Sequence, residues 1–448
     1  MAKLWDKGCK LDKEIERYTV GKDYRLDQNL IEADVAGSLA HAQMLAKIGI
    51  LKPDELKKIK SALLAIVNEH ESGKFTIKPE DEDVHTAVEN YLTKKLGHLG
   101  KKIHTARSRN DQVLVDLRLY TKGKLLDVET SLLNMAGVLL ELAEKNKEVP
   151  MPGRTHTQLA MPSSVGLWAG AYAESLLDDL ELLKTAYEMN DQCPLGSAAS
   201  YGVSLPIDRQ MVSDLLGFKK VQNNVLYANN SRGKIESVVL AALSQVMADL
   251  SKLATDLIFF TIPELDYFEL PDDLCTGSSL MPNKKNPDML ELVRAKANKV
   301  FADYYQVLGT IKDLPSGYNR DFQETKGPLM SSLGTTKASL DVCTLTVSKI
   351  KVNKEKCLKA CVMEIFATDK ALKLAKEGLP FREAYIKVAK ELDKLQGENP
   401  IENIKSKKHL GATGNLGLDK SVSKLKAEEA SISSKRKAYE SALAKLMA

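Results

Sequence analysis

The chain has 448 residues, of which 44% are hydrophobic and 6% aromatic. This length exceeds one small core and predicts roughly two to four structural units. Its 64 basic and 60 acidic residues give a formal net charge of +4, a near-balance that argues against a nucleic-acid or membrane surface. The six cysteines are scattered and form no CxxC pair, so we expect no disulfide framework, no cysteine-bound metal and a reducing, cytoplasmic location.

Neither the N-terminal residues nor the most apolar stretch predicts a membrane segment. The first residues, MAKLWDKGCK, contain no apolar run of signal-peptide length. Residues 235–260 form the most apolar long stretch, but Gln245, Asp249, Lys252 and Asp256 interrupt it. We therefore expect a buried helix there rather than a membrane span.

In chain order, the sequence predicts an all-α protein with three domains. Residues 1–106 show shorter helical segments separated by Gly, Pro and charged turns, and form an N-terminal domain. Residues 107–348 hold five long helices, which form a central bundle domain. Residues 349–448 again favour short helices, with a loop-rich section near Gly411 and Gly417, and form a small C-terminal domain. The absence of a repeat, or of strands alternating with helices, excludes a Rossmann or barrel fold.

Narrow apolar seams support the long helices. In three of them, apolar residues recur at spacings built from three and four, as expected where long helices pack side by side. The other two helices follow Pro162 and Gly327. The three seams are Leu114, Leu117, Leu125, Val128, Leu132, Met135, Leu139 and Leu142; Val239, Leu243, Val246, Leu250, Leu253, Leu257 and Phe260; and Met289, Val293, Ala297, Val300, Tyr304 and Val307.

The connections around the long helices are rich in side chains that bind anions. Four of them mix Arg or Lys with Ser, Thr, Asn, Gln or His, whereas a plain connector needs turn formers and little else. Arg109 and amides such as Asn110 suit carboxylates. Helix capping explains one or two of these residues but not four such loops. An enzyme acting on carboxylate-rich small molecules is therefore predicted, with polar loops at residues 104–112, 152–158, 277–287 and 318–326.

The lengths of the helices keep these loops apart within one chain. A helix from Asp111 to Asn146 is about 50 Å long, and the helix after Asn286 is about 35 Å long. Asn110 and His156 therefore lie near opposite ends of one rod. If all four loops serve one pocket, that pocket must form between subunits, which predicts a homo-oligomer with composite active sites.

The loop Gly277–Pro287, GSSLMPNKKNP, has the composition of a mobile, cationic segment that closes over an acidic substrate. It lacks the GxxxxGK[ST] pattern of a phosphate loop. Lys284 and Lys285 add positive charge, and the helix that begins at Asn286 offers backbone amides to an anion. Composition alone leaves open whether Ser278 is a nucleophile, a base or a ligand.

The same loop resembles the GSSxMPxKxNP signature of the fumarase/aspartase superfamily. HTARSRNDQV resembles the HTGRSRNDQ element of the argininosuccinate lyase family, and MPGRTHTQLAMP resembles its MPGYTHxQxAQP element. YNRDFQETKGPL is similar to YNKDxQEDKxPL, and DEDVHTAVE to DEDxHTxxE. Further matches extend the resemblance from about Asp34 to Tyr385. Adenylosuccinate lyase and fumarase share the signature but lack the SRNDQ and YNxDxQExK pair, which favours the argininosuccinate lyase family.

The resemblance implies a homotetramer with a twenty-helix core and no cofactor or metal. It also implies the reversible anti elimination of argininosuccinate to arginine and fumarate, the last step of arginine biosynthesis. A base removes a proton beside a carboxylate, and the dianionic intermediate then expels the guanidinium. Because such a proton is weakly acidic, positive charge and amide donors must surround the intermediate.

The matched motifs imply roles for single residues. Ser278 would be the base, and Lys284 and Asn286 would hold the carboxylate under attack. His156, paired with Glu291, would be the proton donor or its orienting partner. Further contacts would come from Ser108, Arg109 and Asn110 for the succinyl carboxylates, from Ser38, Tyr318, Gln323 and Lys326 for the arginine part, and from Thr155 and His85 at the pocket wall. For His85, a satisfied buried histidine is an equal alternative.

Two other functions stay open at this point: a lyase for another aminosuccinate, such as adenylosuccinate, and a non-catalytic protein like the lens crystallins. Ala106 replaces the family's Gly, Arg320 replaces its Lys, and residues 224–233 and the N-terminal LWDKGCKL match weakly. Since Ser278 and the other proposed catalytic residues are present, the sequence shows no cause for a loss of activity.

Overall fold

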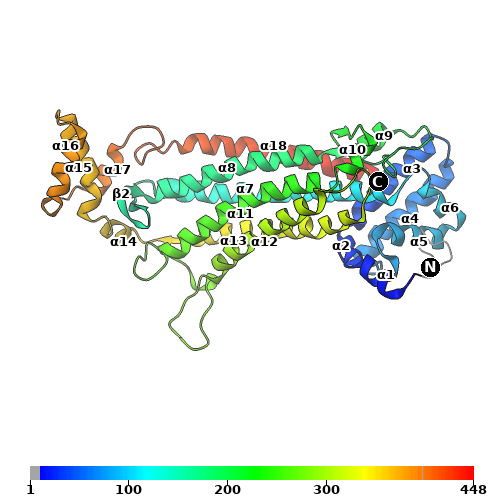
Figure 1. Ribbon diagram of the computed structural model, residues 1–448, viewed down its shortest axis with the longest axis horizontal. Coiled ribbons are helices and arrows are strands. Elements are labelled where there is room, and N and C mark those ends of the chain that lie inside the picture. Colours follow the sequence, from blue (N-terminus) through cyan, green and yellow to red (C-terminus); the bar gives the residue numbers. More distant parts are fainter. Residues whose placement is uncertain (1–10, 396) are drawn as a thin grey trace.

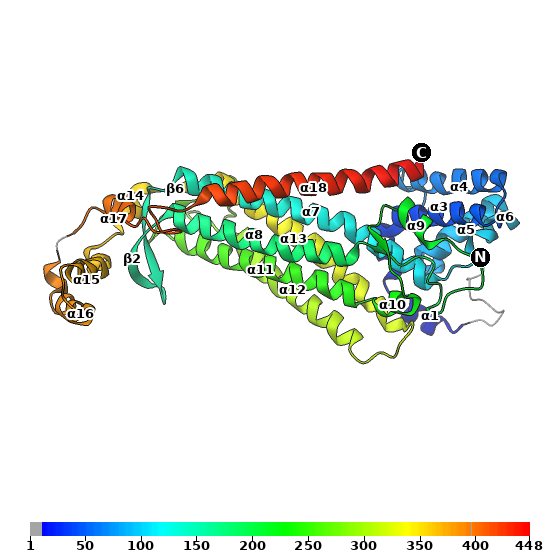
Figure 2. The same ribbon diagram turned by 90° about the horizontal axis from the view of Figure 1, so that it is seen from above.

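The computed structural model describes residues 11–395 and 397–448 as an elongated, mostly helical chain (Figures 1 and 2). The expectations for MAKLWDKGCK and Cys9 fall outside the described residues. Five long helices lie side by side, which confirms the predicted all-α bundle. They are α7 (Arg109–Lys145), α8 (Val165–Asn190), α11 (Lys234–Phe260), α12 (Asp288–Ile311) and α13 (Lys326–Lys349).

The apolar seams fix these helices against one another. Leu125, Leu132 and Leu139 of α7 and Leu243 and Leu250 of α11 are fully buried. Burying one such side chain contributes about 2 kcal/mol of transfer free energy. The repeated seam, more than helix propensity, therefore stabilises helices of this length.

The start of α7 is set by its first residues. The Ser108 backbone N–H donates to the Asp111 carboxylate over 2.9 Å, and the Ser108 hydroxyl accepts from the Asn110 N–H over 3.3 Å. This capping box satisfies N–H groups that the first helical turn leaves without partners. It therefore places Arg109 and Asn110 at the very end of the rod.

Shorter helices cover the two ends of the bundle (Figure 1). The helices of the first 104 residues lie near the start of α7, together with α9 (Arg209–Leu215) and α10 (Val225–Asn230). The helices of the first 104 residues are α1 (Lys13–Val20), α2 (Asp23–Leu26), η1 (Asp27–Leu30), α3 (Ile31–Lys47), α4 (Pro53–Glu71), η2 (Pro79–Asp81), α5 (Val84–Leu96), α6 (His98–Lys101) and η3 (Lys102–His104). The remaining short ones are η4 (Asp272–Leu274), η5 (Arg320–Thr325), α14 (Lys354–Lys359), η6 (Met363–Phe366), α15 (Ala367–Lys376), α16 (Phe381–Lys390), η7 (Leu392–Lys394) and α17 (Pro400–Ser406).

The last helix corrects the expectation of short helices throughout residues 349–448. α18 (Leu418–Met447) has 30 residues and runs back along the bundle against α7, α8 and α3 (Figure 2). Only Ser421, Ile432 and Leu446 of this helix are buried. Leu418, Val422, Leu425, Tyr439 and Leu443 also pack against the core, but Glu429 and Arg436 interrupt their heptad spacing, which hides the seam in the sequence.

Three small two-stranded sheets interrupt the helical chain. β1 (Pro150–Thr155) and β2 (Gln158–Ser164) form an antiparallel hairpin in which Thr155 pairs with Gln158. The sequence predicted only a loop over residues 152–158, so the hairpin is a new feature. The other pairs are β3 (Gln192–Cys193) with β4 (Lys220–Val221), and β5 (Phe268–Glu269) with β6 (Lys351–Val352).

In the described part of the chain, one helix, α11, is long and apolar enough to cross a membrane by length and composition. It packs against α8, α12 and α13, and its seam residues are buried. This arrangement is that of a core helix, as the interrupting polar residues predicted. The cysteines at positions 193, 275, 343, 357 and 361 are all free.

Glu129 of α7 makes stability depend on pH. Its side chain is fully buried, and neither carboxylate oxygen has a hydrogen-bond partner among the described residues. Burial raises the pKa of Glu129 from 4.5 to about 7, although Lys435 and Lys184 oppose the shift. The folded state therefore keeps this proton where the unfolded state loses it. The contribution of Glu129 to stability is thus fully present below pH 4.5 and is lost as pH rises through about 7.

We expect Glu129→Gln to remove that fall, because the amide carries no charge. The difference in unfolding free energy between the two proteins should grow to as much as ~3 kcal/mol above the folded pKa. Denaturant unfolding of both proteins across this pH range measures it. Parallel pH profiles would contradict the assignment.

Candidate active site

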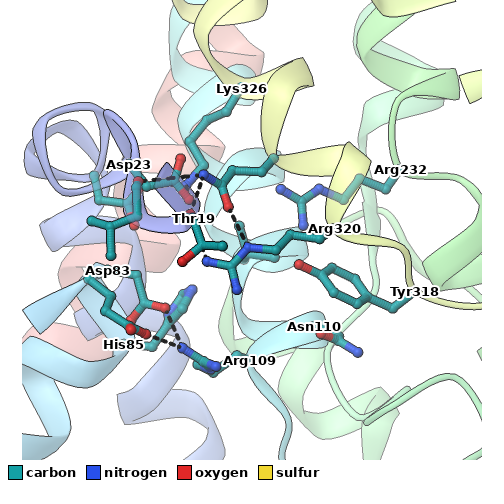
Figure 3. Close-up of a pocket in the computed structure, with 15 residues that line it drawn as sticks. Thr19, Asp23, Asp83, His85, Arg109, Asn110, Arg232, Tyr318, Arg320 and Lys326 are labelled. Carbon is teal, nitrogen blue, oxygen red and sulfur yellow. Dashed lines mark hydrogen bonds and ion pairs between the residues drawn. The ribbon is translucent and has the colours of Figure 1, made fainter. Parts of the chain in front are cut away.

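A pocket with a cavity volume of about 130 Å³ opens where the start of α7 meets the N-terminal helices (Figure 3). Besides residues from α1, α2 and η1, it is lined by segments around α5, α7, α11 and η5. It brings together six of the residues that the sequence predicted for substrate binding. They are His85, Arg109, Asn110, Tyr318, Gln323 and Lys326.

Lys326 is a buried residue in the lining of this pocket. Its ammonium lies 2.5 Å from Asp27 and 3.3 Å from Asp23, and its side chain is almost fully buried. Burial alone would lower the pKa of Lys326, but the carboxylates of Asp27 and Asp23 raise it above its usual value. The lysine is therefore a permanent cation.

Arg109 lies at the pocket wall and is held by two acidic residues. Its Nη1 donates to Asp83 over 2.9 Å and to Glu82 over 3.4 Å (Figure 3). Burial opposes ionisation of Asp83, but His85, Arg109 and the Thr86 amide lower its pKa below the usual value. The Arg109 side chain stays 30% exposed, so part of its guanidinium remains open to a ligand.

Gln323 and Arg320 fix the loop after α12 to the end of α1. Both donate to the Thr19 carbonyl, over 3.1 Å and 2.7 Å, and Arg320 also donates to the Gln323 side-chain oxygen over 3.2 Å. Tyr318 projects into the same space (Figure 3). A segment more than 300 residues from α1 in sequence thus completes the pocket.

His85 is part of a buried cluster with Asp34 and Asp116. Its Nδ1 lies 2.7 Å from Asp34 and 3.6 Å from Asp116. Burial, followed by the nearby carboxylates of Asp34 and Asp27, raises the pKa of Asp116 well above its usual value. The three groups also have the spacing of metal ligands. However, 2.7 Å is the distance of a charge-assisted hydrogen bond, which fixes the imidazole at the pocket wall.

Ser38 and Ser108 both form hydrogen bonds within the chain. Ser38 is fully buried, lies outside the pocket lining and accepts from Arg107 over 2.8 Å. In the single chain Ser38 therefore does not line the pocket, and its contact with substrate stays a prediction. Ser108 caps α7, as the capping explanation predicted.

Ser278 lies in the loop between α11 and α12, which projects from the bundle away from the N-terminal helices (Figure 1). Backbone hydrogen bonds between Thr276 and Asn286 close the base of the loop, over 3.1 and 2.8 Å. The Ser278 hydroxyl accepts from the Leu280 and Met281 amides over 3.2 and 3.1 Å. Two amide donors directed at one oxygen favour its anionic form.

Lys284 and Glu291 are both exposed in the isolated chain. Within the described residues, neither side chain forms an ion pair with another. Asn286 is half-buried and donates to the Gly277 carbonyl over 3.3 Å. These groups are thus available to a ligand or to a second chain.

His156 lies at the tip of the β1–β2 hairpin, next to Thr155. His156 and Thr157 have φ values of 54° and 60°, and form a two-residue turn of type I′. For residues other than Gly, this conformation costs roughly 1–2 kcal/mol each. Both side chains are exposed.

The predicted residues therefore form two groups at opposite ends of the bundle (Figures 1 and 2). Arg109, Tyr318 and Lys326 lie at one end, and Ser278 and His156 lie towards the other. The 24-residue helix α12 between them spans about 36 Å. One chain does not bring the two groups together.

The pocket also contains charged residues that the sequence reasoning did not assign. Glu82 and Asp83 stand in the matched DEDVHTAVE motif, so the sequence could have indicated them as pocket residues. Asp23 and Asp27 carried no signal, because only the packing of α2 and η1 places them beside Lys326. Counting all lining residues, acidic Asp23, Asp27, Glu82 and Asp83 face basic Arg109, Arg232, Arg320 and Lys326.

Comparison with known proteins agrees with this architecture. A family described as lyase matches residues 11–302. The argininosuccinate lyase of Thermotoga neapolitana is 45% identical over 87% of this chain and 98% of that protein. The enzyme of the same name from Bacteroides thetaiotaomicron is 44% identical over 93% of each chain.

Solved structures share the fold at lower identity. EDDS lyase in complex with formate has a TM-score of 0.82 and 21% identity, and the match covers 96% of this chain and 95% of that one. Class II fumarase from Schistosoma mansoni has a TM-score of 0.70 and 17% identity, over 86% and 94% of the two chains. With relatives more than 40% identical over most of its length, the chain belongs to the argininosuccinate lyase family.

Proposed function

We propose that the chain catalyses the reversible anti elimination of argininosuccinate to arginine and fumarate, without a cofactor, as the last step of arginine biosynthesis in the cytoplasm. The mixed charge of the pocket is the observation that carries this proposal. Its cations suit the carboxylates of the substrate, and its carboxylates suit a guanidinium or ammonium group. A substrate that carries both kinds of charge matches both sets of groups, which pair with one another in the chain alone.

Ser278 is proposed as the base that removes the proton beside the succinyl carboxylate. The amide donors at its hydroxyl oxygen support this role, because they stabilise the alkoxide that a serine base requires. Lys284 and Asn286 hold the carboxylate under attack and stabilise the charge that develops on it. His156, with Glu291, is the proton donor or its orienting partner.

The remaining predicted residues bind the substrate. Ser108, Arg109 and Asn110 bind the succinyl carboxylates at the start of α7. Tyr318, Gln323 and Lys326 hold the arginine part. His85 and Thr155 lie at opposite ends of the helix bundle and line the completed site from different subunits. Asp23 and Asp27 join this set as candidate contacts for the guanidinium, since both line the pocket.

A homotetramer with composite active sites is proposed as the working form. The separation of Ser278 from Arg109 supports it, because a long helix keeps the two apart in one chain. Four copies of the five long helices supply a twenty-helix core. Each site then takes its binding pocket from one subunit and its base from another.

A substrate panel tests the proposed reaction. Purified enzyme is given argininosuccinate, adenylosuccinate or no substrate, and fumarate is measured by its ultraviolet absorbance. The expected result is fumarate and arginine in equal amounts from argininosuccinate alone. Turnover of adenylosuccinate instead would favour the other aminosuccinate lyase, and a tetramer inactive on both would favour the non-catalytic alternative.

A further inference from the structure

The hairpin tip holds His156 in a backbone conformation that its sequence does not favour. His156 and Thr157 both have positive φ, and neither is Gly, Asn or Asp, the residues that a type I′ turn prefers. Inside the turn, the Thr157 hydroxyl donates to the His156 carbonyl over 2.6 Å. Since both side chains are exposed, contacts from outside the turn must fix its position.

Arg154 of β1 supplies such contacts. Its Nη1 donates to the Thr157 carbonyl over 2.8 Å. Its Nη2 donates to the Tyr267 hydroxyl over 3.4 Å, and its guanidinium lies 5.4 Å from the centre of the Phe259 ring. Phe259 belongs to α11, and Tyr267 is a buried residue just beyond that helix. One side chain thus connects the turn with the end of the bundle.

The geometry depends on a guanidinium. A planar group with several N–H donors can bond in two directions while its face lies over an aromatic ring. A lysine ammonium can replace the bond to the Thr157 carbonyl but does not reproduce the planar contact with Phe259. Both hydrogen bonds of Arg154 come from its Nη atoms. Its Nε is buried and has no hydrogen-bond partner in the part of the chain that the structure describes.

We propose that Arg154 is a positioning residue that fixes the His156 imidazole for proton transfer. This inference rests on the proposed function, which gives His156 a role in the elimination. Arg154 acts through the turn and not on the reacting atoms. Because misplacing a catalytic group by about 1 Å can cost roughly 10²-fold in rate, the loss of Arg154 lowers kcat and leaves KM nearly unchanged.

A double-mutant cycle tests this proposal. Argininosuccinate kinetics are measured for wild type, Arg154→Ala, His156→Asn and the double variant. Arg154→Ala should lower kcat by roughly 10²-fold in the wild-type background, but by less than about twofold when His156 is already Asn. Arg154→Lys should recover part of kcat, because it keeps one donor for the Thr157 carbonyl. If Arg154→Ala does not fold, Arg154→Lys takes its place in the double-mutant cycle.

The control is Arg436→Ala on α18, which removes a half-buried arginine bound to Asp127 over 3.0 Å, away from the hairpin. It should leave kcat and KM unchanged. An equal loss from Arg154→Ala in both backgrounds, or a rise in KM with kcat unchanged, would overturn the proposal. An inactive wild-type enzyme would instead refute the proposed function, and full activity of His156→Asn would refute the role of that histidine.

Discussion

Replacing Ser278 with alanine is expected to lower kcat by roughly 10³-fold, the typical contribution of a general base. The variant loses the only oxygen that the Leu280 and Met281 amides polarise in this loop. Since the pocket near Lys326 lies at the other end of the helix bundle, argininosuccinate binding should survive. Steady-state kinetics, calorimetric binding and sedimentation of the same preparation separate these effects.

The neighbouring Ser279 provides the matched comparison, because it lies on the same loop and is more exposed than Ser278. Ser279→Ala should cost clearly less activity than Ser278→Ala. A loss of less than tenfold from Ser278→Ala would contradict its assignment as the base. A larger loss from Ser279→Ala would show that the wrong serine was assigned.

Replacing Arg109 with alanine is expected to lower kcat/KM by about 10²-fold or more. A charge-assisted contact with a substrate carboxylate contributes on the order of 3 kcal/mol, which corresponds to that factor. Arg109→Lys should lie between alanine and wild type, because it keeps the charge but not the bidentate geometry. The loss should appear mainly in KM and in the dissociation constant of the substrate.

Arg25→Ala on α2 is the control, because this arginine is near the pocket in sequence and fold but does not line it. It should keep kcat/KM close to the wild-type value. If Arg109→Ala changed kcat/KM by less than about threefold, the pocket would not bind the succinyl carboxylates.

The long helices could be predicted because their seams repeat over many turns. Leu125, Leu132 and Leu139 are buried at heptad spacing, so the pattern reports the packing directly. α18 was not recognised as a long helix, since Glu429 and Arg436 interrupt the apolar spacing of its contact face. The hairpin was missed because its turn, Thr155–Gln158, lacks the Gly or Asn that marks a two-residue connection.

The candidate site was predictable only where a motif carried it. Arg109 and Lys326 stand in matched motifs, and the structure places both in one pocket. Asp23 and Asp27 lie outside those motifs, and their role depends on how two short helices pack. Ser38 stands in DVAGSLAHAQML, which resembles the family's DIxGSxAHxxML, but it is fully buried and does not line the pocket. Arg154 replaces the Tyr of the family motif, so the motif gave no reason to consider it.

Mixing two impaired variants, assayed at a substrate concentration well below the wild-type KM, tests the composite site most directly. Ser278→Ala and Arg109→Ala tetramers are combined in equal amounts under conditions that exchange subunits, and activity is compared with each variant alone. With pocket and base on different chains, random assortment should restore about one quarter of wild-type activity, because that fraction of sites receives both intact parts. If mixed tetramers form but activity stays at the level of the separate variants, both residues serve the site of one chain and the account is contradicted.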